Sequence, residues 1–153
     1  MITDTAESGG ACNCFAVRAA ARHVSQYYDR FLAPTGLRAT QFSILAKLKR
    51  TGPLTISALA EDMVMDRTTL GRNILPLQRD GLITIEPAAS DRRAKELHVT
   101  RAGEKRLQAG RKRWAAAQKG FESAFGAKRA AELRAFLHAV VASEFAPADR
   151  RPG

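Results

Sequence analysis

Four polar side chains suited to bonding with nucleic-acid bases lie close together in the segment MDRTTLGRNILPLQRDGL, residues 65–82. Thr68 and Thr69 can donate or accept hydrogen bonds and offer methyl groups, whereas Arg72 can pair bidentately with guanine and Asn73 with adenine. At about 100° per residue, a helix through this segment turns Thr68 and Arg72 away from an apolar face. That face consists of Leu70, Ile74 and Leu77. The spacing predicts a helix that either reads bases in a DNA major groove or simply presents a solvated face.

A second group of charged side chains lies in SDRRAK, residues 90–95, where Asp91, Arg92 and Arg93 are consecutive. The flanking stretches LITIE (82–86) and KELHV (95–99) are short, and the second alternates between polar and apolar residues. Both features are typical of β-strands. We therefore expect a β-hairpin with a basic tip, which is either an ordinary charged loop or a contact for a negatively charged partner.

Helical patterns surround these two features. We expect helices at residues 13–32, 40–50, 67–79 and 127–145, a short helix capped by Thr55 and a long one capped by Thr100. Asp66 is expected to cap the helix 67–79, and Pro76 to kink it or tighten its last turn. A short helix, a turn near residues 62–65 and a second helix with a polar face form a helix-turn-helix, and the hairpin makes it a winged variant. The predicted fold class is mainly α (α+β).

The helices outside this central lobe carry apolar stripes that we expect to be buried. The first stripe is Val17, Ala20, Ala21, Val24, Tyr28 and Phe31; the second is Leu107, Gly110, Trp114, Ala117, Phe121 and Phe125; the third is Leu133, Phe136, Leu137, Val140, Val141 and Phe145. One compact lobe cannot easily bury the last helix together with the apolar residues of the first. A two-fold dimer would bury them and place two recognition helices about 34–36 Å apart, one turn of DNA.

The charge and composition narrow the functional classes. The formal net charge is +10, and its excess is central: residues 34–51 carry a net +4 and residues 66–113 a net +6. A local basic surface is expected of a nucleic-acid binder. No apolar run approaches the roughly 18 residues that suggest a membrane span, so a cytoplasmic location is the default. Nucleophile-elbow, P-loop, dinucleotide-binding and metalloprotease motifs are missing, and the histidines are scattered, so we expect no enzyme, no metal and no cofactor.

The chain resembles the MarR family of bacterial winged-helix regulators. The resemblance rests on GLRATQFSILAKL (36–48), LTISALAEDMVMDRTTLGRNILPLQRDGLI (54–83) and DRRAKELHVTRAG (91–103), of which the last is the most specific. It implies a homodimer that represses transcription from a palindromic operator and is released by a small aromatic or phenolic ligand, often a carboxylate. It also implies that Thr68, Thr69, Arg72 and Asn73 contact DNA, that Arg92 enters the minor groove, and that Asp91 braces an arginine. Arg93 is expected to pair with Asp91 or to contact phosphate.

The resemblance also suggests how the chain is organised. A single domain is expected at residues 12–146, with a DNA-binding lobe at 37–100 and dimerisation helices at 12–33 and 101–146. Residues 1–11 and 147–153 are expected to be flexible.

Two regions could control such a regulator. An arginine or His23 could hold the carboxylate of a ligand, while aromatic side chains stack on the ring of that ligand. The candidates are Arg18, Arg22, His23, Tyr27 and Phe42. Each of them could instead be an interface, ion-pair or solvated residue. Cys12 and Cys14 are either reduced thiols near a helix start or sensors of oxidants. A further alternative is an architectural protein that binds all DNA sequences alike.

Overall fold

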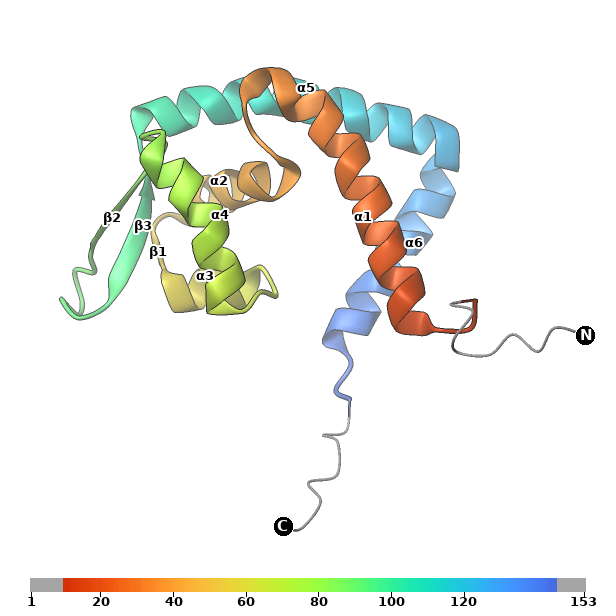
Figure 1. The fold of residues 1–153 in the computed structure, drawn as a ribbon, viewed down its shortest axis with the longest axis horizontal. Helices are drawn as coiled ribbons and strands as arrows, with labels where there is room; N and C mark the ends of the chain where they lie inside the picture. Colours follow the sequence, from red (N-terminus) through yellow and green to blue (C-terminus); the bar gives the residue numbers. More distant parts are fainter. Residues whose placement is uncertain (1–9, 146–153) are drawn as a thin grey trace, which may run out of the picture. The chain divides into compact units, whose positions relative to one another are not determined.

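The computed structural model describes residues 10–145, which are mainly helical with one small antiparallel sheet (Figure 1). The elements are α1 (Asn13–Leu32), a short 3-10 helix η2 (Ala33–Thr35), α2 (Ala39–Thr51), β1 (Leu54–Thr55), α3 (Ile56–Asp62), α4 (Arg67–Arg79), β2 (Ile83–Pro87), β3 (Lys95–Val99), α5 (Arg101–Phe125) and α6 (Ala127–Ala142). The predicted mainly α winged-helix class is confirmed. Residues 1–9 and 147–153 of the segments expected to be flexible lie outside the described residues, as does residue 146.

The chain divides into two compact units within α5, after Ala117. In the first unit, α2, α3, α4 and the sheet enclose one core. Its largest fully buried side chains are Leu32, Ile44, Leu45, Leu59, Leu70, Leu77, Ile83, Leu97 and Leu107. Every one of them is aliphatic, so the lobe is held together by apolar burial, which needs no metal or disulfide.

The sheet has the strand order β1-β3-β2, and both pairs are antiparallel. Leu97 in the middle strand lies opposite Leu54 on one side and Ile85 on the other. The β2–β3 hairpin was expected, whereas β1 was not. A two-residue strand has too few positions to show an alternating pattern, and only its partner β3 reveals it.

The start of α5 is packed closely against the start of β2 and the end of β3. The Thr100 hydroxyl donates to the Gly81 carbonyl at 2.6 Å and accepts the Gly103 backbone N–H at 3.0 Å. A Cβ at Gly103 would lie only 2.1 Å from the Leu82 carbonyl oxygen. Glycine is therefore required where the helix crosses the strand end, as it is at Gly110, where a Cβ would lie 2.8 Å from the Phe42 ring.

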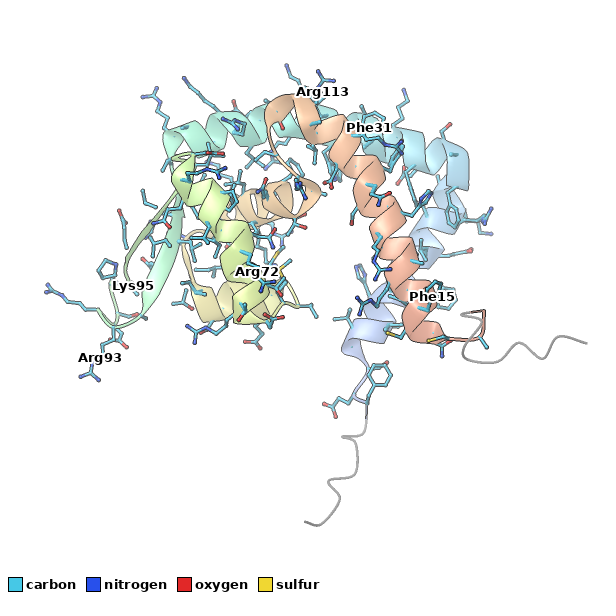
Figure 2. All side chains as sticks on the ribbon, in the orientation of Figure 1. Phe15, Phe31, Arg72, Arg93, Lys95 and Arg113 are labelled. Atoms are coloured by element: carbon cyan, nitrogen blue, oxygen red, sulfur yellow. The ribbon has the colours of Figure 1, made fainter. Side chains whose placement is uncertain are left out.

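The first helix begins and ends where the sequence predicts, but its expected buried stripe is wrong for the single chain. Of its residues, only Leu32 is buried, and Val17 is 46% exposed. Phe15 and Phe31 are labelled along this helix in Figure 2. Tyr27 packs against Tyr28 and Phe31 of the same helix, with ring centroids 5.6 and 5.1 Å apart.

The second unit comprises the end of α5 and α6. Phe121 packs on Phe125, Arg129 lies 4.2 Å from the Phe125 ring centroid, and Arg134 pairs with Glu122 at 3.5 Å. The last helix ends at Ala142 and not at the predicted residue 145, because Ser143 is extended and its hydroxyl bonds to Ala139.

The predicted inward face of α6 is also wrong for the single chain, as is the burial of Trp114. The exposed side chains are Trp114, Phe136, Leu137, Val140, Val141 and Phe145. The periodicity identified an apolar face, but residues of the same chain do not cover it.

Candidate DNA-binding surface

A tight turn joins α3 to α4. The N–H of Val64 donates to the Glu61 carbonyl at 3.1 Å, and that of Met65 donates to Ala60 at 2.9 Å. Val64 has a φ of 54°, a left-handed conformation that β-branched residues rarely adopt. These bonds end α3 and redirect the chain within three residues, so the two helices form the expected helix-turn-helix.

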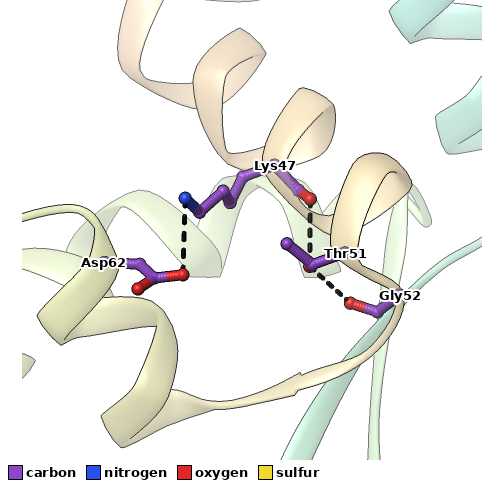
Figure 3. Close-up of polar contacts among 4 residues, drawn as sticks. All are labelled: Lys47, Thr51, Gly52 and Asp62. Atoms are coloured by element: carbon purple, nitrogen blue, oxygen red, sulfur yellow. Dashed lines mark hydrogen bonds and ion pairs between the residues drawn. The ribbon is translucent and has the colours of Figure 1, made fainter.

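Two further contacts hold α3 and its surroundings in place. Lys47 of α2 pairs with Asp62 at the end of α3, with 3.4 Å between Nζ and Oδ2 (Figure 3). The Thr51 hydroxyl bonds to the carbonyls of Lys47 and Gly52 where α2 ends. The burial of Leu59 and Ala60 against the core adds to this positioning.

The cap of α4 is the expected residue, Asp66. Its carboxylate accepts the backbone N–H of Thr69 at 2.7 Å and the Thr69 hydroxyl at 2.8 Å. The Thr69 backbone bond, followed by the hydroxyl bond, lowers the pKa of Asp66 below its ordinary value of 3.8. Asp66 therefore stays ionised at the positive end of the helix, where a negative charge is favoured.

The two faces of α4 separate as predicted. Leu70, Ile74 and Leu77 are buried, while Thr68 and Arg72 are exposed. Figure 2 shows Arg72 on this helix. An arginine at such a position has all its guanidinium donors available for a base or a phosphate.

The other two predicted contacts have partners inside the helix. The Thr69 hydroxyl donates to Asp66, so toward DNA it can only accept a hydrogen bond or offer its methyl. The Asn73 amide nitrogen donates to the Thr69 carbonyl at 2.9 Å, and one of its two hydrogens remains. Arg79 near the end of α4 is paired with Asp80 at 3.1 Å.

Pro76 lies within α4, and the helix nevertheless continues to Arg79. Proline has no N–H, so the carbonyl of Arg72 lacks its usual partner four residues later. The last turn closes through the Asp80 N–H, which donates to the Pro76 carbonyl at 3.0 Å. The side chains of Thr68 and Arg72 precede this irregularity.

The hairpin carries a structured tip. The Asp91 carboxylate accepts the Arg93 backbone N–H at 3.0 Å, and the Ala88 N–H donates to the Ala94 carbonyl at 2.9 Å. Arg92 and Arg93 are exposed, and Arg93 is labelled at the tip in Figure 2. In Figure 1, the tip and the N-terminal end of α4 lie toward the same edge of the lobe, so one partner could meet both.

The outer face of the hairpin holds a cluster that the sequence only partly indicated. His98 Nε2 lies 3.0 Å from Glu96 Oε1 and 3.3 Å from Glu86 Oε2. The alternation in KELHV placed Glu96 and His98 on one face, but Glu86 joins them only through the strand register, which pairs Glu86 with Glu96. The histidine therefore lies between two carboxylates that would otherwise repel each other.

The predicted effector residues are in different surroundings. Arg18, Arg22 and His23 are exposed on α1, and Tyr27 packs on its own helix. Phe42 is a buried core residue whose ring stacks on Trp114 at 6.3 Å. Within residues 10–145, no group of three or more histidine, cysteine or acidic side chains is arranged to hold a metal ion. No helix in that range is long and apolar enough to span a membrane.

Comparisons with known proteins identify this architecture. A profile of the MarR family matches residues 37–95, which run from α2 to the start of β3. The M. tuberculosis transcriptional regulator MosR is 33% identical in sequence, with a TM-score of 0.74, over 88% of this chain and 98% of its own. The chain belongs to the MarR family. It is therefore related to DNA-binding transcriptional regulators, which accords with the arrangement of α4 and the hairpin.

Further MarR-like structures carry partners. MosR in complex with DNA is 34% identical and has a TM-score of 0.74, over 88% of this chain and 99% of that chain. CouR from Rhodococcus jostii RHA1, bound to p-coumaroyl-CoA, shares the fold at 22% identity and a TM-score of 0.72, over 87% of this chain and 94% of that chain. A comparison with curated protein sequences gave no match.

Proposed function

We propose that this MarR-family protein is a homodimeric cytoplasmic repressor that binds a palindromic operator and is released by a small aromatic or phenolic ligand. The observation that carries the proposal is the outward face of α4, where Thr68 and Arg72 are exposed above a buried apolar face. Thr68, Thr69, Arg72 and Asn73 then meet base edges in the major groove. With its donors engaged, Thr69 acts as an acceptor or through its methyl.

The hairpin supplies the second contact in this proposal. Arg92 enters the minor groove, where a narrow A·T-rich segment has enhanced negative potential. Arg93 contacts phosphate. Asp91 braces the tip, and its hydrogen bond to the Arg93 backbone supports that role.

The proposed organisation assigns residues 12–146 to one domain, with the DNA-binding lobe at 37–100 and dimerisation through residues 12–33 and 101–146. The apolar side chains exposed on α1 and α6 support the dimer. An effector that binds near α1 would use Arg18, Arg22 or His23 for its carboxylate and Tyr27 for its ring. Phe42 would line the proposed ligand site from the core side.

The decisive experiment compares Arg72→Ala with Arg72→Lys on a selected operator and on random DNA. Alanine removes the guanidinium, and we expect a loss of about 1–3 kcal/mol, roughly 5- to 150-fold, on the operator only. Lysine keeps the charge but not the bidentate fork, so it should retain the salt dependence and lose preference at one base position. Equal losses on both DNAs would contradict base reading, and equal wild-type affinity for all duplexes would favour an architectural protein.

Arg92→Ala tests the hairpin contact. Because this side chain is exposed, the variant should fold normally and bind the operator more weakly. Circular dichroism and fluorescence anisotropy measure the two properties. Unchanged operator affinity in a folded variant would overturn the proposed contact of Arg92 with DNA.

A second candidate trigger is thiol oxidation, which one contact favours. Cys12 caps α1, and its sulfur accepts the Phe15 backbone N–H at 3.4 Å, at the helix end that stabilises negative charge. Cys14 lies in the first turn, so the two side chains diverge, and a disulfide between them requires that turn to unwind.

The two triggers are separated by the double variant Cys12→Ser, Cys14→Ser. If a ligand is the trigger, benzoate or 4-hydroxybenzoate should release operator DNA from the wild type and the double variant alike. If oxidation is the trigger, peroxide should release DNA from the wild type only. Arg22→Ala should weaken the response to the aromatic acids alone.

A further inference from the structure

Leu75 stands apart from the other apolar residues of α4. Its side chain is 64% exposed, whereas Leu70, Ile74 and Leu77 are buried. Exposed large apolar residues in the described chain fall into two groups. One group lies on α1, α5 and α6 or directly after α6, and the other consists of Val64 and Leu75 in the helix-turn-helix. The first group has a proposed protein partner, whereas the second lies where DNA is proposed to bind.

The position of Leu75 on the helix decides what it would meet. At about 100° per residue, Leu75 lies about 20° from Thr68 and about 60° from Arg72 around the axis, and about 140° from Leu70. It therefore belongs to the outward face. Along the axis it is about 10 Å beyond Thr68, which corresponds to about three base steps of DNA.

Several polar side chains of the same helix are engaged in hydrogen bonds or ion pairs near the helix, so an apolar residue could also contribute to base recognition. Thr69 donates its hydroxyl to Asp66, Asn73 donates to Thr69, and Arg79 is paired with Asp80. Of the four residues predicted to contact bases, Thr68 and Arg72 are therefore the two whose side chains are not engaged within the helix. In the major groove, the feature that an apolar side chain recognises is the C5-methyl group of thymine.

We propose that Leu75 is a specificity-determining residue that recognises a thymine methyl group on the operator. The inference rests on the proposed function, because it requires α4 to enter the major groove. Leu75 would discriminate thymine at a position beyond the bases that Thr68 and Arg72 read. The Leu75 side chain is then exposed in the free protein because it forms part of the DNA-contacting surface. Its burial against the thymine methyl group would favour binding to sites that carry this methyl.

The test uses deoxyuridine, which lacks only the C5-methyl group of thymine. Wild-type protein first selects a binding sequence from a random duplex library. Each thymine of the half-site is then replaced by deoxyuridine, one position at a time, and affinities are measured by fluorescence anisotropy. At one position the affinity of the wild type should fall about fourfold per half-site, which is the effect of losing the burial of about one methyl group. Leu75→Ala and Leu75→Asn should bind the two duplexes equally, whereas Leu75→Met should retain the preference.

Three outcomes would overturn the inference. The wild type could bind every deoxyuridine duplex as tightly as the thymine duplex, or Leu75→Ala could still discriminate thymine from deoxyuridine, which is the behaviour expected if Leu75 contacts only the DNA backbone. In either case the selected operator would still stand, and so would the proposed function. If the wild type selects no sequence from the library, both the proposed function and the role of Leu75 fail.

Discussion

The helices α4 and α6 both carry an apolar face that the sequence predicts, but only one of these faces is covered by the chain itself. On α4, Leu70, Ile74 and Leu77 are buried in the lobe, whereas on α6, Phe136 and Val141 are 73% and 62% exposed. Their starts differ as well: Asp66 caps α4 with its side chain, and Gly126 offers α6 no side-chain cap. The difference separates a helix whose apolar face is covered by its own chain from one whose apolar face is left exposed in the single chain.

The largest effect should come from Leu70→Ala on α4. The side chain is fully buried, so its loss leaves a cavity and should lower the free energy of unfolding by about 2–5 kcal/mol in urea titrations. The matched control is Leu75→Ala, an exposed leucine on the same helix, which should change stability by at most about 0.5 kcal/mol. Similar losses for both would erase the distinction between the two faces of α4.

A change on α6 should act on assembly instead of folding of the lobe. Phe136→Asp places a charge on the exposed apolar face of α6. It should weaken the free energy of dimerisation by about 2 kcal/mol or more, and sedimentation equilibrium measures the dimer dissociation constant. Glu132→Ala, an exposed polar residue on the same helix, should leave the dimer unchanged. A monomeric wild type at micromolar concentration would contradict the proposed dimer.

The smallest effect concerns the cap of α4 and appears as a pH dependence. Because the pKa of Asp66 is lowered in the folded protein, its contribution to stability is fully present above about 3.8 and is lost as the pH falls through the lower folded value. Asp66→Asn should therefore melt below the wild type near neutral pH, and the two melting temperatures should converge in acid.

Local signals predicted much of the fold. Cap and breaker residues predicted several helix ends correctly. Thr55 and Asp66 form the expected side-chain caps of α3 and α4, and α1 ends at Leu32, before Pro34, as expected. Non-local features escaped prediction. The strand β1 depends on pairing with Leu97, and the contact of Glu86 with His98 depends on the hairpin register.

The candidate site was predicted in part for the same reason. Helical periodicity indicated that Thr68 and Arg72 face outward, but not that Thr69 and Asn73 are engaged inside the helix. The burial of Phe42 depends on Trp114 and Gly110, which lie about 70 residues further along the chain. The same periodicity could not distinguish the covered face of α4 from the uncovered face of α6, because both have the same local pattern.

The close packing around Thr100 has a mechanical consequence. One hydroxyl joins Gly81, just past α4, to the first turn of α5, and Gly103 leaves no gap against the Leu82 carbonyl. These contacts allow little bending, so α4, the hairpin and the first turn of α5 should move together as one rigid unit. In the proposed dimer, a hinge on the α5 side that changes the distance between two such units therefore lies beyond Gly103.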